Sequence, residues 1–239
     1  MLPWRLSYAR CVIRTVVFDG DQTLWDFETA RQEALTIVCD EIIRATGASS
    51  VEVSPARLQQ LWQEINAEHT GWRFEAMRRE SFRRLLLDIE VRDAPLADTF
   101  TDCYFSARFS HCQVYPDVVP CLSELRRSYR VVLLSNGNTY PDRLGIGHLF
   151  DGVFFAQDIG FGKPDRRAFG HVQDALDTPA NEMLNIGDSL ENDVWGALNV
   201  GWNALWLNRD ELAYPNVEPA VAMLANLGSL PSHEVLSAN

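Results

Sequence analysis

The chain has 239 residues and carries 21 Lys and Arg against 33 Asp and Glu, which gives a formal net charge of −12 at pH 7. Such an acidic balance argues against a nucleic-acid partner, because nucleic-acid binding depends on a basic surface. No apolar run approaches the ~20 residues that cross a bilayer, and the first residues lack the apolar segment of a signal peptide. At ~100–200 residues per domain, we expect one large domain or a domain with a smaller second lobe, and no membrane association.

The cysteines indicate a reducing compartment. Their number is odd and none is spaced C-x-x-C, which is unlike a disulfide framework or a zinc site. We therefore predict a cytoplasmic protein in which the cysteines are buried structural thiols: Cys11, Cys39, Cys103, Cys112 and Cys121.

Five short apolar runs have the length and the β-branched content of buried strands: residues 12–18, 130–134, 152–156, 183–186 and 203–207. Their hydrophobicity is nearly continuous, as expected when helices cover both faces of a sheet. Stretches of helical character separate the later four runs, so strand and helix alternate from about residue 118. The sequence therefore predicts an α/β fold with a parallel sheet, followed by a last helix and an irregular end after Arg209.

More than 100 residues without a convincing strand lie between the first run and the second. Apolar side chains recur there at spacings of three and four residues, which is a helical period. Pro116 marks the expected end of this region. We predict an inserted all-α lobe of four helices, with these stripes: Leu35, Val38, Ile42 and Ala45, closed by Gly47; Leu58, Leu61, Trp62 and Ile65; Phe74, Phe82, Leu85, Leu86 and Ile89; Leu96, Phe100, Cys103 and Ala107.

Side chains that could perform chemistry follow the first predicted strand. Asp19 and Asp21 come directly after it, and Thr23 lies two residues further on. Taken alone, this Asp-Gly-Asp sequence could be an ordinary turn. The functional interpretation is a nucleophilic carboxylate beside a second acid.

Three further strands end in polar groups. Ser135 and Asn136 end the second strand, Lys163 lies in a Gly- and Pro-flanked loop after the third, and Asp188 and Asp193 follow the fourth. Each could be structural alone, as a helix cap, a turn or a solvated ammonium. All of them fall at the carboxyl ends of parallel strands, however, where open α/β sheets bind ligands. Their joint occurrence favours a functional site.

These motifs resemble those of the haloacid dehalogenase superfamily, most closely its phosphatases with a helical cap after the first strand. The pattern D-x-D-x-T matches Asp19, Asp21 and Thr23, and the later motifs match Ser135, Lys163 and the Gly187-Asp188 to Asp193 segment. Similarity covers residues 12–30 and 115–209, whereas the cap matches in position and helical character only. Gln22 and Gly20 depart from the commoner residues at positions that carry no chemistry.

The resemblance implies a three-layer Rossmann-like core of residues 1–26 and 115–239, with an inserted all-α cap of the C1 type at residues 27–114. It also implies a Mg²⁺-dependent phosphatase that hydrolyses a small phosphomonoester through an aspartyl-phosphate intermediate. Asp19 would be the nucleophile and Asp21 the general acid and base. Asp19, Asp188 and the Asp21 carbonyl would bind the metal, with Asp193 as a ligand or as a supporting acceptor.

Phosphate binding is also implied by the resemblance. Ser135, Asn136 and Lys163 would hold the phosphoryl oxygens that do not face the metal, with the backbone N–H groups near Asn136 contributing. Thr23 belongs to the same group, and its hydroxyl would order the first loop. Lys163 would also offset the negative charge of Asp19.

Several alternatives remain compatible with these motifs. A 2-haloacid dehalogenase uses the same fold and an Asp nucleophile, but a halide leaves without a proton, so Asp21 and the acidic Asp188 motif favour a phosphatase. A sugar phosphomutase needs the same four motifs. A receiver-type signalling module would bind a partner instead of turning over a substrate, and it lacks the inserted helices. The expected partner is a small phosphorylated metabolite. Candidate specificity residues are Trp25, His69, Trp72, Arg73 and Tyr104.

Overall fold

The protein is represented by a computed structural model that describes residues 12–69, 71–212 and 221–236. Its chain divides into two compact units. The first, here called the sheet unit, comprises Met1–Leu24, Tyr115–Gly137 and Gly145–Asn239. The second, the helical unit, comprises Trp25–Val114 and Asn138–Leu144.

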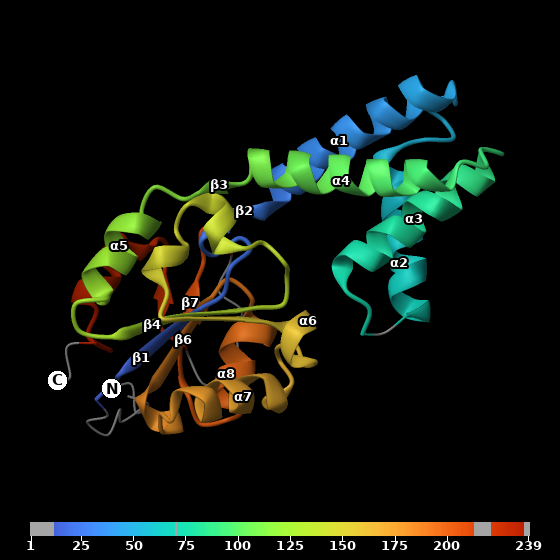
Figure 1. Ribbon diagram of the computed structural model, residues 1–239. Coiled ribbons are helices and arrows are strands. Elements are labelled where there is room, and N and C mark those ends of the chain that lie inside the picture. The colour runs from blue at the N-terminus through green and yellow to red at the C-terminus, as the bar shows by residue number, and fades with distance from the viewer. Residues whose placement is uncertain (1–11, 70, 213–220, 237–239) are drawn as a thin grey trace. The chain divides into compact units, whose positions relative to one another are not determined.

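The sheet unit is built on a six-stranded parallel sheet with the strand order β5-β4-β1-β6-β7-β8 (Figure 1). The predicted parallel α/β fold is therefore confirmed. The bounds of its strands are β1 Thr15–Phe18, β4 Arg130–Ser135, β5 Gly152–Phe155, β6 Met183–Gly187, β7 Asn203–Leu207 and β8 Met223–Leu224.

Strand β1 lies between β4 and β6 and is buried along its whole length. Phe18, its last residue, pairs with Leu133 of β4 and Ile186 of β6. The backbone N–H of Asp19 continues this pairing by donating to the Ile186 carbonyl oxygen at 2.9 Å. Three strands consequently end at the same edge of the sheet, and the residues that follow them are brought together there.

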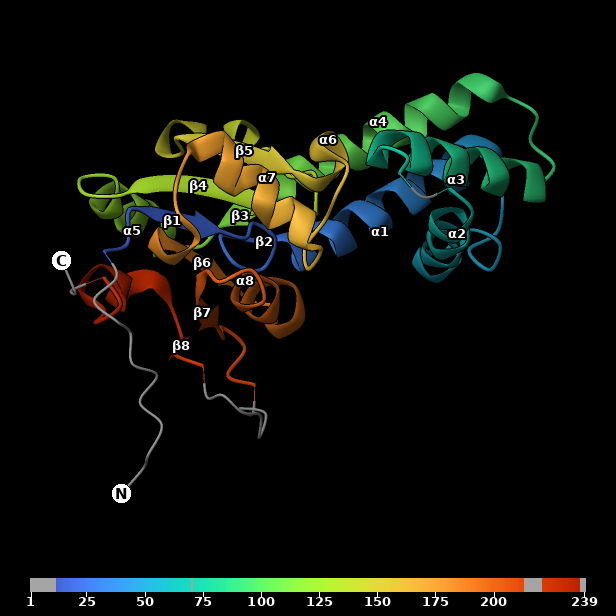
Figure 2. The same ribbon diagram turned by 90° about the horizontal axis from the view of Figure 1, so that it is seen from below.

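Helices cover both faces of this sheet, with α5 on one face and α7 and α8 on the other (Figures 1 and 2). Apolar residues point from both sides into the sheet, which explains why the strands read as nearly continuous hydrophobic runs. The helices of this unit are α5 Val118–Leu125, α6 Ala156–Ile159, α7 Arg166–Leu176, the π-helix Leu190–Trp195 and α8 Gly196–Leu198.

One expectation about the connections of this sheet is wrong. The segment between β4 and β5 holds no α-helix but two short 3₁₀ helices, Pro141–Leu144 and Gly147–Leu149. Pro141 lacks a backbone donor, and Gly145 has φ +73°, a conformation that ends a helix. After Arg209, where a last helix and an irregular end were expected, the described residues contain β8 and a 3₁₀ helix over Leu227–Ser232.

The helical unit contains the four predicted helices and a short antiparallel pair of strands, β2 and β3. Asp26 begins α1, because its side chain accepts from the backbone N–H of Thr29 at 3.0 Å. Gly47 ends it in the left-handed conformation. The bounds are β2 Trp25–Asp26, α1 Phe27–Thr46, α2 Pro55–Glu68, α3 Phe74–Asp88, α4 Ala94–His111 and β3 Gln113–Val114.

Most side chains of the predicted apolar stripes are buried, and one core cluster combines side chains from all four helices. Two stripe residues differ from the prediction, because Ala45 is exposed and Phe74 is only half-buried. Of the cysteines, Cys39, Cys112 and Cys121 are buried, Cys103 is half-buried, and Cys11 lies outside the described residues. Among the helices that the structure describes, none has both the length and the apolar character needed to cross a membrane.

A buried polar network links α4 to the segment after β4. The Arg108 guanidinium donates to the Asn138 side-chain oxygen at 2.6 Å and to its carbonyl oxygen at 3.2 Å. The Asn138 side-chain amide in turn donates to Glu75 at 3.2 Å. The Arg108 guanidinium also lies 4.7 Å from the ring centroid of Phe109. This network fixes residues 138–144 to the helical unit.

Candidate active site

An ammonium group and two carboxylates meet at the carboxyl edge of the sheet. Lys163 Nζ donates to Asp19 Oδ1 at 2.6 Å and to Asp193 Oδ1 at 2.5 Å. Asp19, Lys163 and Asp193 are only 8%, 4% and 1% exposed. A buried charge is stable only when it is paired, so this triad holds its members in fixed positions.

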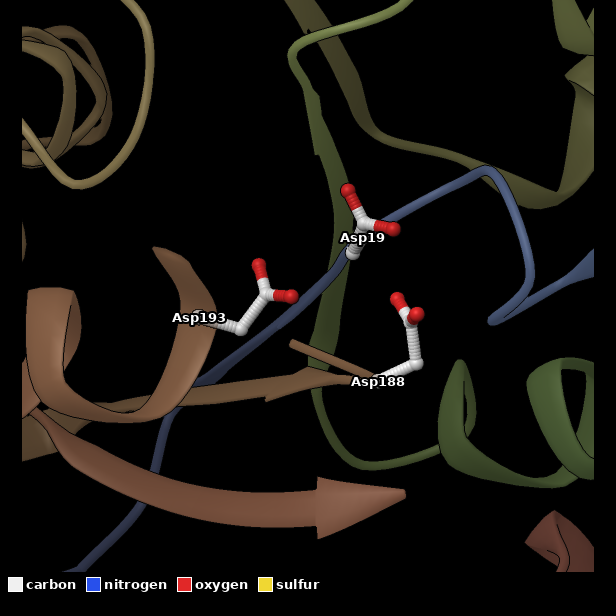
Figure 3. A group of neighbouring side chains, drawn as sticks. All are labelled: Asp19, Asp188 and Asp193. Carbon is white, nitrogen blue, oxygen red and sulfur yellow. The ribbon is translucent and has the colours of Figure 1, made fainter. Parts of the chain in front are cut away.

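A third acid, Asp188, lies beside Asp19 and Asp193. Asp19, Asp188 and Asp193 each offer a carboxylate oxygen, and these oxygens lie within 4.8 Å of one another. Figure 3 shows the three carboxyl groups turned toward a common space, with Asp19 coming from the end of β1 and Asp188 from the end of β6. Three acids and one ammonium leave two formal negative charges, and hard oxygen ligands suit a divalent cation such as Mg²⁺.

The pKa values of Asp19 and Asp188 are raised, in part because several acids lie close together. Burial raises the pKa of Asp19 above its ordinary value despite the opposing effect of Lys163, and Asp193 and Asp188 raise it further. Burial and the nearby Asp193 raise the pKa of Asp188 to about 6. Burial alone would lower the pKa of Lys163, but Asp19 and Asp193 together hold it above its ordinary value. A cation in this space would relieve the repulsion among the acids.

The carboxylate oxygens are not equally available. Both oxygens of Asp193 are engaged, because Oδ1 accepts from Lys163 and Oδ2 accepts from the Ser189 backbone N–H at 3.1 Å. Among the described residues, the side-chain hydrogen bonds to Asp19 and Asp188 are both made to Oδ1, from Lys163 and from Thr23, so that each Oδ2 faces no side-chain donor. The residues present thus fit a metal ion, with Asp19 and Asp188 presenting the available oxygens.

A π-helical turn brings Asp193 back to the end of β6. The wide turn of Leu190–Trp195 follows Ser189, whose hydroxyl accepts from the Asn192 backbone N–H at 3.2 Å. Gly187 is required at the strand end, because a Cβ atom there would overlap the Asp193 carboxylate. π-helical turns are often found at functional sites, and here the turn places the counter-ion of Lys163.

Thr23 joins the first loop to Asp188. Its hydroxyl donates to Asp188 Oδ1 at 3.2 Å and accepts from the Asp188 backbone N–H at 3.1 Å. The Thr23 carbonyl oxygen accepts from Arg209 Nε at 3.0 Å, and Arg209 makes a bidentate ion pair with Asp117. The structure therefore gives Thr23 an ordering contact with an acidic residue of the site.

Asn136 holds the backbone of Lys163 through its side chain. Its amide donates to the Lys163 carbonyl oxygen, and its oxygen accepts from the Lys163 N–H, both at 2.7 Å. This pair of hydrogen bonds fixes the loop that carries the ammonium group against the end of β4. Asn136 was expected among the phosphate-binding residues. Its side-chain amide and oxygen are both hydrogen-bonded to the backbone of Lys163.

Ser135 and Asp21 lie close together beside Gly137. The Gly137 backbone N–H donates to Ser135 Oγ at 3.0 Å. A Cβ atom at Gly137 would overlap Asp21 Oδ2 and would lie 3.4 Å from Ser135 Oγ. The Asp21 carboxyl group therefore packs directly over this glycine, next to the serine hydroxyl, and only a residue without a side chain fits there.

Sequence reasoning missed four residues that support the site: Gly137, Asn185, Arg209 and Trp206. Trp206 Nε1 donates to the Asp188 carbonyl oxygen at 2.8 Å, and Asn185 Nδ2 donates to that of Asp193 at 3.1 Å. Both residues lie in predicted strands. The apolar pattern that predicts a strand does not indicate which loop carbonyl a polar side chain in that strand will contact.

Two of the expected specificity residues are buried in the helical unit. Trp25 is fully buried and Tyr104 is 1% exposed, so neither side chain presents an open surface to a substrate. The rings of His69 and Trp72 stack on each other with centroids 3.9 Å apart.

A family model described as haloacid dehalogenase-like hydrolase matches residues 13–201, which include all the acidic residues above, Ser135 and Lys163. The chain belongs to the haloacid dehalogenase-like hydrolases. The resemblance stated from the sequence motifs is therefore confirmed, and the protein is a hydrolase of this family.

Curated relatives among these hydrolases carry phosphatase names. The chain is 27% identical over 235 residues to the 5-amino-6-(5-phospho-D-ribitylamino)uracil phosphatase YigB of Escherichia coli, a match that covers 91% of this chain and 96% of that protein. It is 28% identical over 217 residues to a glyceraldehyde 3-phosphate phosphatase of Methanopyrus kandleri, covering 87% and 88%.

Solved structures of the family include both dehalogenases and phosphatases. A 2-haloacid dehalogenase from Pseudomonas syringae superposes with a TM-score of 0.80 at 28% identity, covering 92% of this chain and 97% of that one. A haloacid dehalogenase-like phosphatase from Thermococcus onnurineus superposes with a TM-score of 0.67 at 26% identity over the same shares of the two chains.

Proposed function

We propose that this hydrolase is a Mg²⁺-dependent phosphatase that hydrolyses a small phosphomonoester through an aspartyl-phosphate intermediate. The observation that carries this proposal is the contact of Lys163 Nζ with Asp19 Oδ1 at 2.6 Å, beside a group of three acids. A phosphomonoester is an anion, so its attack by a carboxylate requires cationic groups on both sides of the phosphoryl group. The phosphatase names of the curated relatives support the same reading.

In this proposal, Asp19 and Asp188 hold the metal through their available carboxylate oxygens, and Asp21 adds its backbone carbonyl. Asp193 acts indirectly, as the counter-ion that keeps Lys163 in place, because both of its oxygens are already engaged. When bound, Mg²⁺ neutralises phosphoryl oxygens and orients the attacking carboxylate.

The reaction then uses two acids in sequence. A carboxylate oxygen of Asp19 attacks phosphorus, the ester P–O bond breaks, and Asp21 gives its proton to the leaving alkoxide. Ionised Asp21 next takes a proton from water, which attacks phosphorus and releases inorganic phosphate and free Asp19. Gly137 leaves room for the Asp21 carboxyl group beside Ser135, where a leaving group and then a water could meet it.

Lys163 and Ser135 are proposed to bind the phosphoryl oxygens that do not face the metal. The ammonium supplies positive charge in a buried setting, where an ion pair is stronger than in water, and the hydroxyl supplies a hydrogen bond. Asn136 contributes by fixing Lys163 and through nearby backbone N–H groups, and Thr23 contributes by holding Asp188.

A second candidate is a 2-haloacid dehalogenase, which the likeness to the Pseudomonas syringae structure favours. A dehalogenase displaces a halide from carbon, and a halide departs without a proton. The placement of Asp21 against Gly137 and the acidic group around Asp188 are then left without a role. A sugar phosphomutase would use the same residues but would have to exclude water, and membership of a hydrolase family counts against a receiver-type module.

Residues 27–114 are proposed to serve as the cap of a catalytic core formed by residues 1–26 and 115–239. This region includes helices α1 to α4, and we propose that it selects among small phosphorylated metabolites.

The test measures hydrolysis of p-nitrophenyl phosphate with Mg²⁺ and with EDTA, for the wild type and for Asp19→Asn. Turnover should require Mg²⁺ and should be lost in the variant. Trapping of ³²P on the wild type, but not on the variant, would identify the aspartyl-phosphate. Equal turnover under all conditions would falsify the assignment, and release of chloride from chloroacetate without metal would establish the dehalogenase instead.

A further inference from the structure

The helical unit contains a pocket of about 430 Å³ whose lining includes none of the acidic residues described above. Its volume falls within the range of ~300–1,000 Å³ that is typical of small-molecule sites. It is lined by Arg31 from α1, by residues of α2 and by residues of α3. The pocket belongs to the helical unit alone, so its chemistry can be read without reference to the sheet unit.

The lining residues follow the helical repeat. On α2 they are Gln59, Trp62, Gln63 and Asn66, spaced as i, i+3, i+4 and i+7, and on α3 they are Phe74, Met77 and Arg78, spaced as i, i+3 and i+4. Residues with this spacing share one face of a helix. Two helix faces therefore line the pocket, one rich in amide side chains and the other ending in an arginine.

Arg78 is the distinctive member of this lining. Its guanidinium carbon lies 3.7 Å from the ring centroid of Trp62, and the nearby Tyr104 favours its charged form. Among the described residues, no carboxylate lies within ion-pair distance of Arg78, whereas its neighbour Arg79 pairs with Asp98. Arg78 is thus a partly buried cation without a counter-ion.

Other groups around Arg78 add positive charge and an unused donor. Burial lowers the pKa of Arg78, and the nearby Arg108 and Arg31 lower it further. Arg31 itself is neutralised by Glu28, to which it donates two hydrogen bonds. The indole N–H of Trp62 is buried and has no hydrogen-bond partner in the described structure. In a chain of net charge −12, this pocket is locally cationic.

We propose that this pocket binds a small hydroxylated oxyanion, whose carboxylate or phosphate pairs with Arg78 and whose hydroxyl groups meet the amides of Gln59, Gln63 and Asn66. A guanidinium matches the planar or tetrahedral oxygens of such an anion. Each amide side chain can both donate and accept, as a hydroxyl does. Two sources supply this chemistry: the non-reacting end of the substrate, if the proposed phosphatase function holds, or a separate small molecule.

The first experiment measures binding without catalysis. Isothermal titration of the metal-free protein compares L-tartrate, which has two carboxylates and two hydroxyls, with erythritol, a neutral polyol of the same carbon number. Tartrate should bind and erythritol should not, and the binding should weaken in high salt because it depends on charge. Arg78→Met should weaken tartrate binding at least about tenfold, and Arg78→Lys should weaken it less, because the charge is kept.

Arg79→Met is the matched control, because it removes the same group from the next position of α3, where the arginine pairs with Asp98 at the surface. It should leave tartrate binding unchanged. Circular dichroism of each variant separates loss of the site from loss of the fold, and the salt dependence of the wild type tests the site even if Arg78→Met does not fold. Equal effects of Arg78→Met and Arg79→Met, or a Kd for tartrate weaker than about 10 mM, would overturn the proposal.

The second experiment distinguishes the two sources. With Mg²⁺ present, KM and kcat are compared for 3-phosphoglycerate, which has a carboxylate, and glycerol 3-phosphate, which has none. An increase in KM for 3-phosphoglycerate alone in Arg78→Met identifies the non-reacting end of the substrate, whereas unchanged KM values with tartrate binding lost identify a separate ligand. Failure of the phosphatase proposal is recognised independently, as absent p-nitrophenyl phosphate turnover in a protein that still binds tartrate.

Discussion

Thr23 and Asp188 are joined by two hydrogen bonds of opposite direction, one from the hydroxyl to Oδ1 and one from the backbone N–H to the hydroxyl. The pair connects loops that lie 165 residues apart in the chain. It fixes both the position and the orientation of a carboxylate that offers its other oxygen to the space shown in Figure 3.

Thr23→Val keeps the shape of the side chain and removes both hydrogen bonds. The Asp188 carboxylate then loses its orientation, and its backbone N–H loses an acceptor. We expect the affinity for Mg²⁺ to fall about 10–100-fold, as is usual when a group supporting a metal ligand is removed. Magnesium titrations of activity measure this, with Thr23→Ser as the control that keeps the hydroxyl. Equal Mg²⁺ affinities for the two variants would contradict the prediction.

Lys163→Met should destabilise the metal-free protein by about 3 kcal/mol near neutral pH, because it leaves the buried Asp19 and Asp193 without a counter-ion. Adding Asp193→Asn should restore much of this stability, since one of the unpaired charges is then gone. Urea unfolding of the single and double variants measures the difference. The double variant should remain inactive, because the ammonium is still missing. A double variant less stable than Lys163→Met would argue against the ion pair.

The stability of the metal-free protein should fall as the pH rises from about 4 to 7. The pKa of Asp188 is raised by burial and by Asp193, to about 6, and that of Asp19 is also raised, mainly by burial. The folded state therefore binds these protons more tightly than the unfolded state, so ionisation of the acids disfavours folding. Urea unfolding in EDTA measures the trend.

Asp188→Asn is the informative comparison for this pH dependence. It removes one of the titrating groups, so its stability should fall less over the same range. Mg²⁺ should flatten the wild-type profile by binding the ionised form. A metal-free profile that rises with pH, or that Asp188→Asn leaves unaltered, would be inconsistent with raised pKa values.

Gly137→Ala should lower kcat at least about tenfold, because small misplacements of reacting groups are costly. The added methyl group would overlap Asp21 Oδ2 and move the proposed acid and base. Gly170→Ala is the matched control: it lies in α7, a Cβ atom there meets nothing within 4 Å, and alanine should raise stability by about 0.5–1 kcal/mol. Steady-state kinetics measures kcat and thermal unfolding measures stability for both variants. A kcat of Gly137→Ala equal to that of the wild type would show that Asp21 tolerates the methyl group.

The sequence predicted the residues that meet at the sheet edge because their positions follow from topology. Asp19, Ser135 and Asp188 directly follow or end strands of one parallel sheet, so the strand pairing alone brings them together. Strand β7 was predicted with its observed bounds, since its apolar run is bordered by polar residues. The helical insertion was predicted from its periodicity, and Gly47 ends α1 as expected.

Contacts between distant side chains could not be predicted in this way. The hydrogen bonds of Asn136 to the Lys163 backbone and the fit of Asp21 over Gly137 depend on loop conformation, which apolar spacing does not encode. The expected helix between β4 and β5 is wrong for a related reason: Pro141 and the positive φ of Gly145 outweigh the apolar residues there. Trp62 was predicted as a core residue from its helical spacing. That spacing does not indicate that a pocket lies beside it.

Residues 138–144 belong to the helical unit although the chain reaches them directly from Gly137, beside the proposed phosphate site. Arg108 donates a hydrogen bond to the Asn138 side chain, which in turn donates one to Glu75. Any engineering that grafts a foreign insertion between residues 24 and 115 would strip Asn138 of these contacts. A working chimera must therefore exchange two non-contiguous pieces of sequence together, and natural recombination at this junction faces the same requirement.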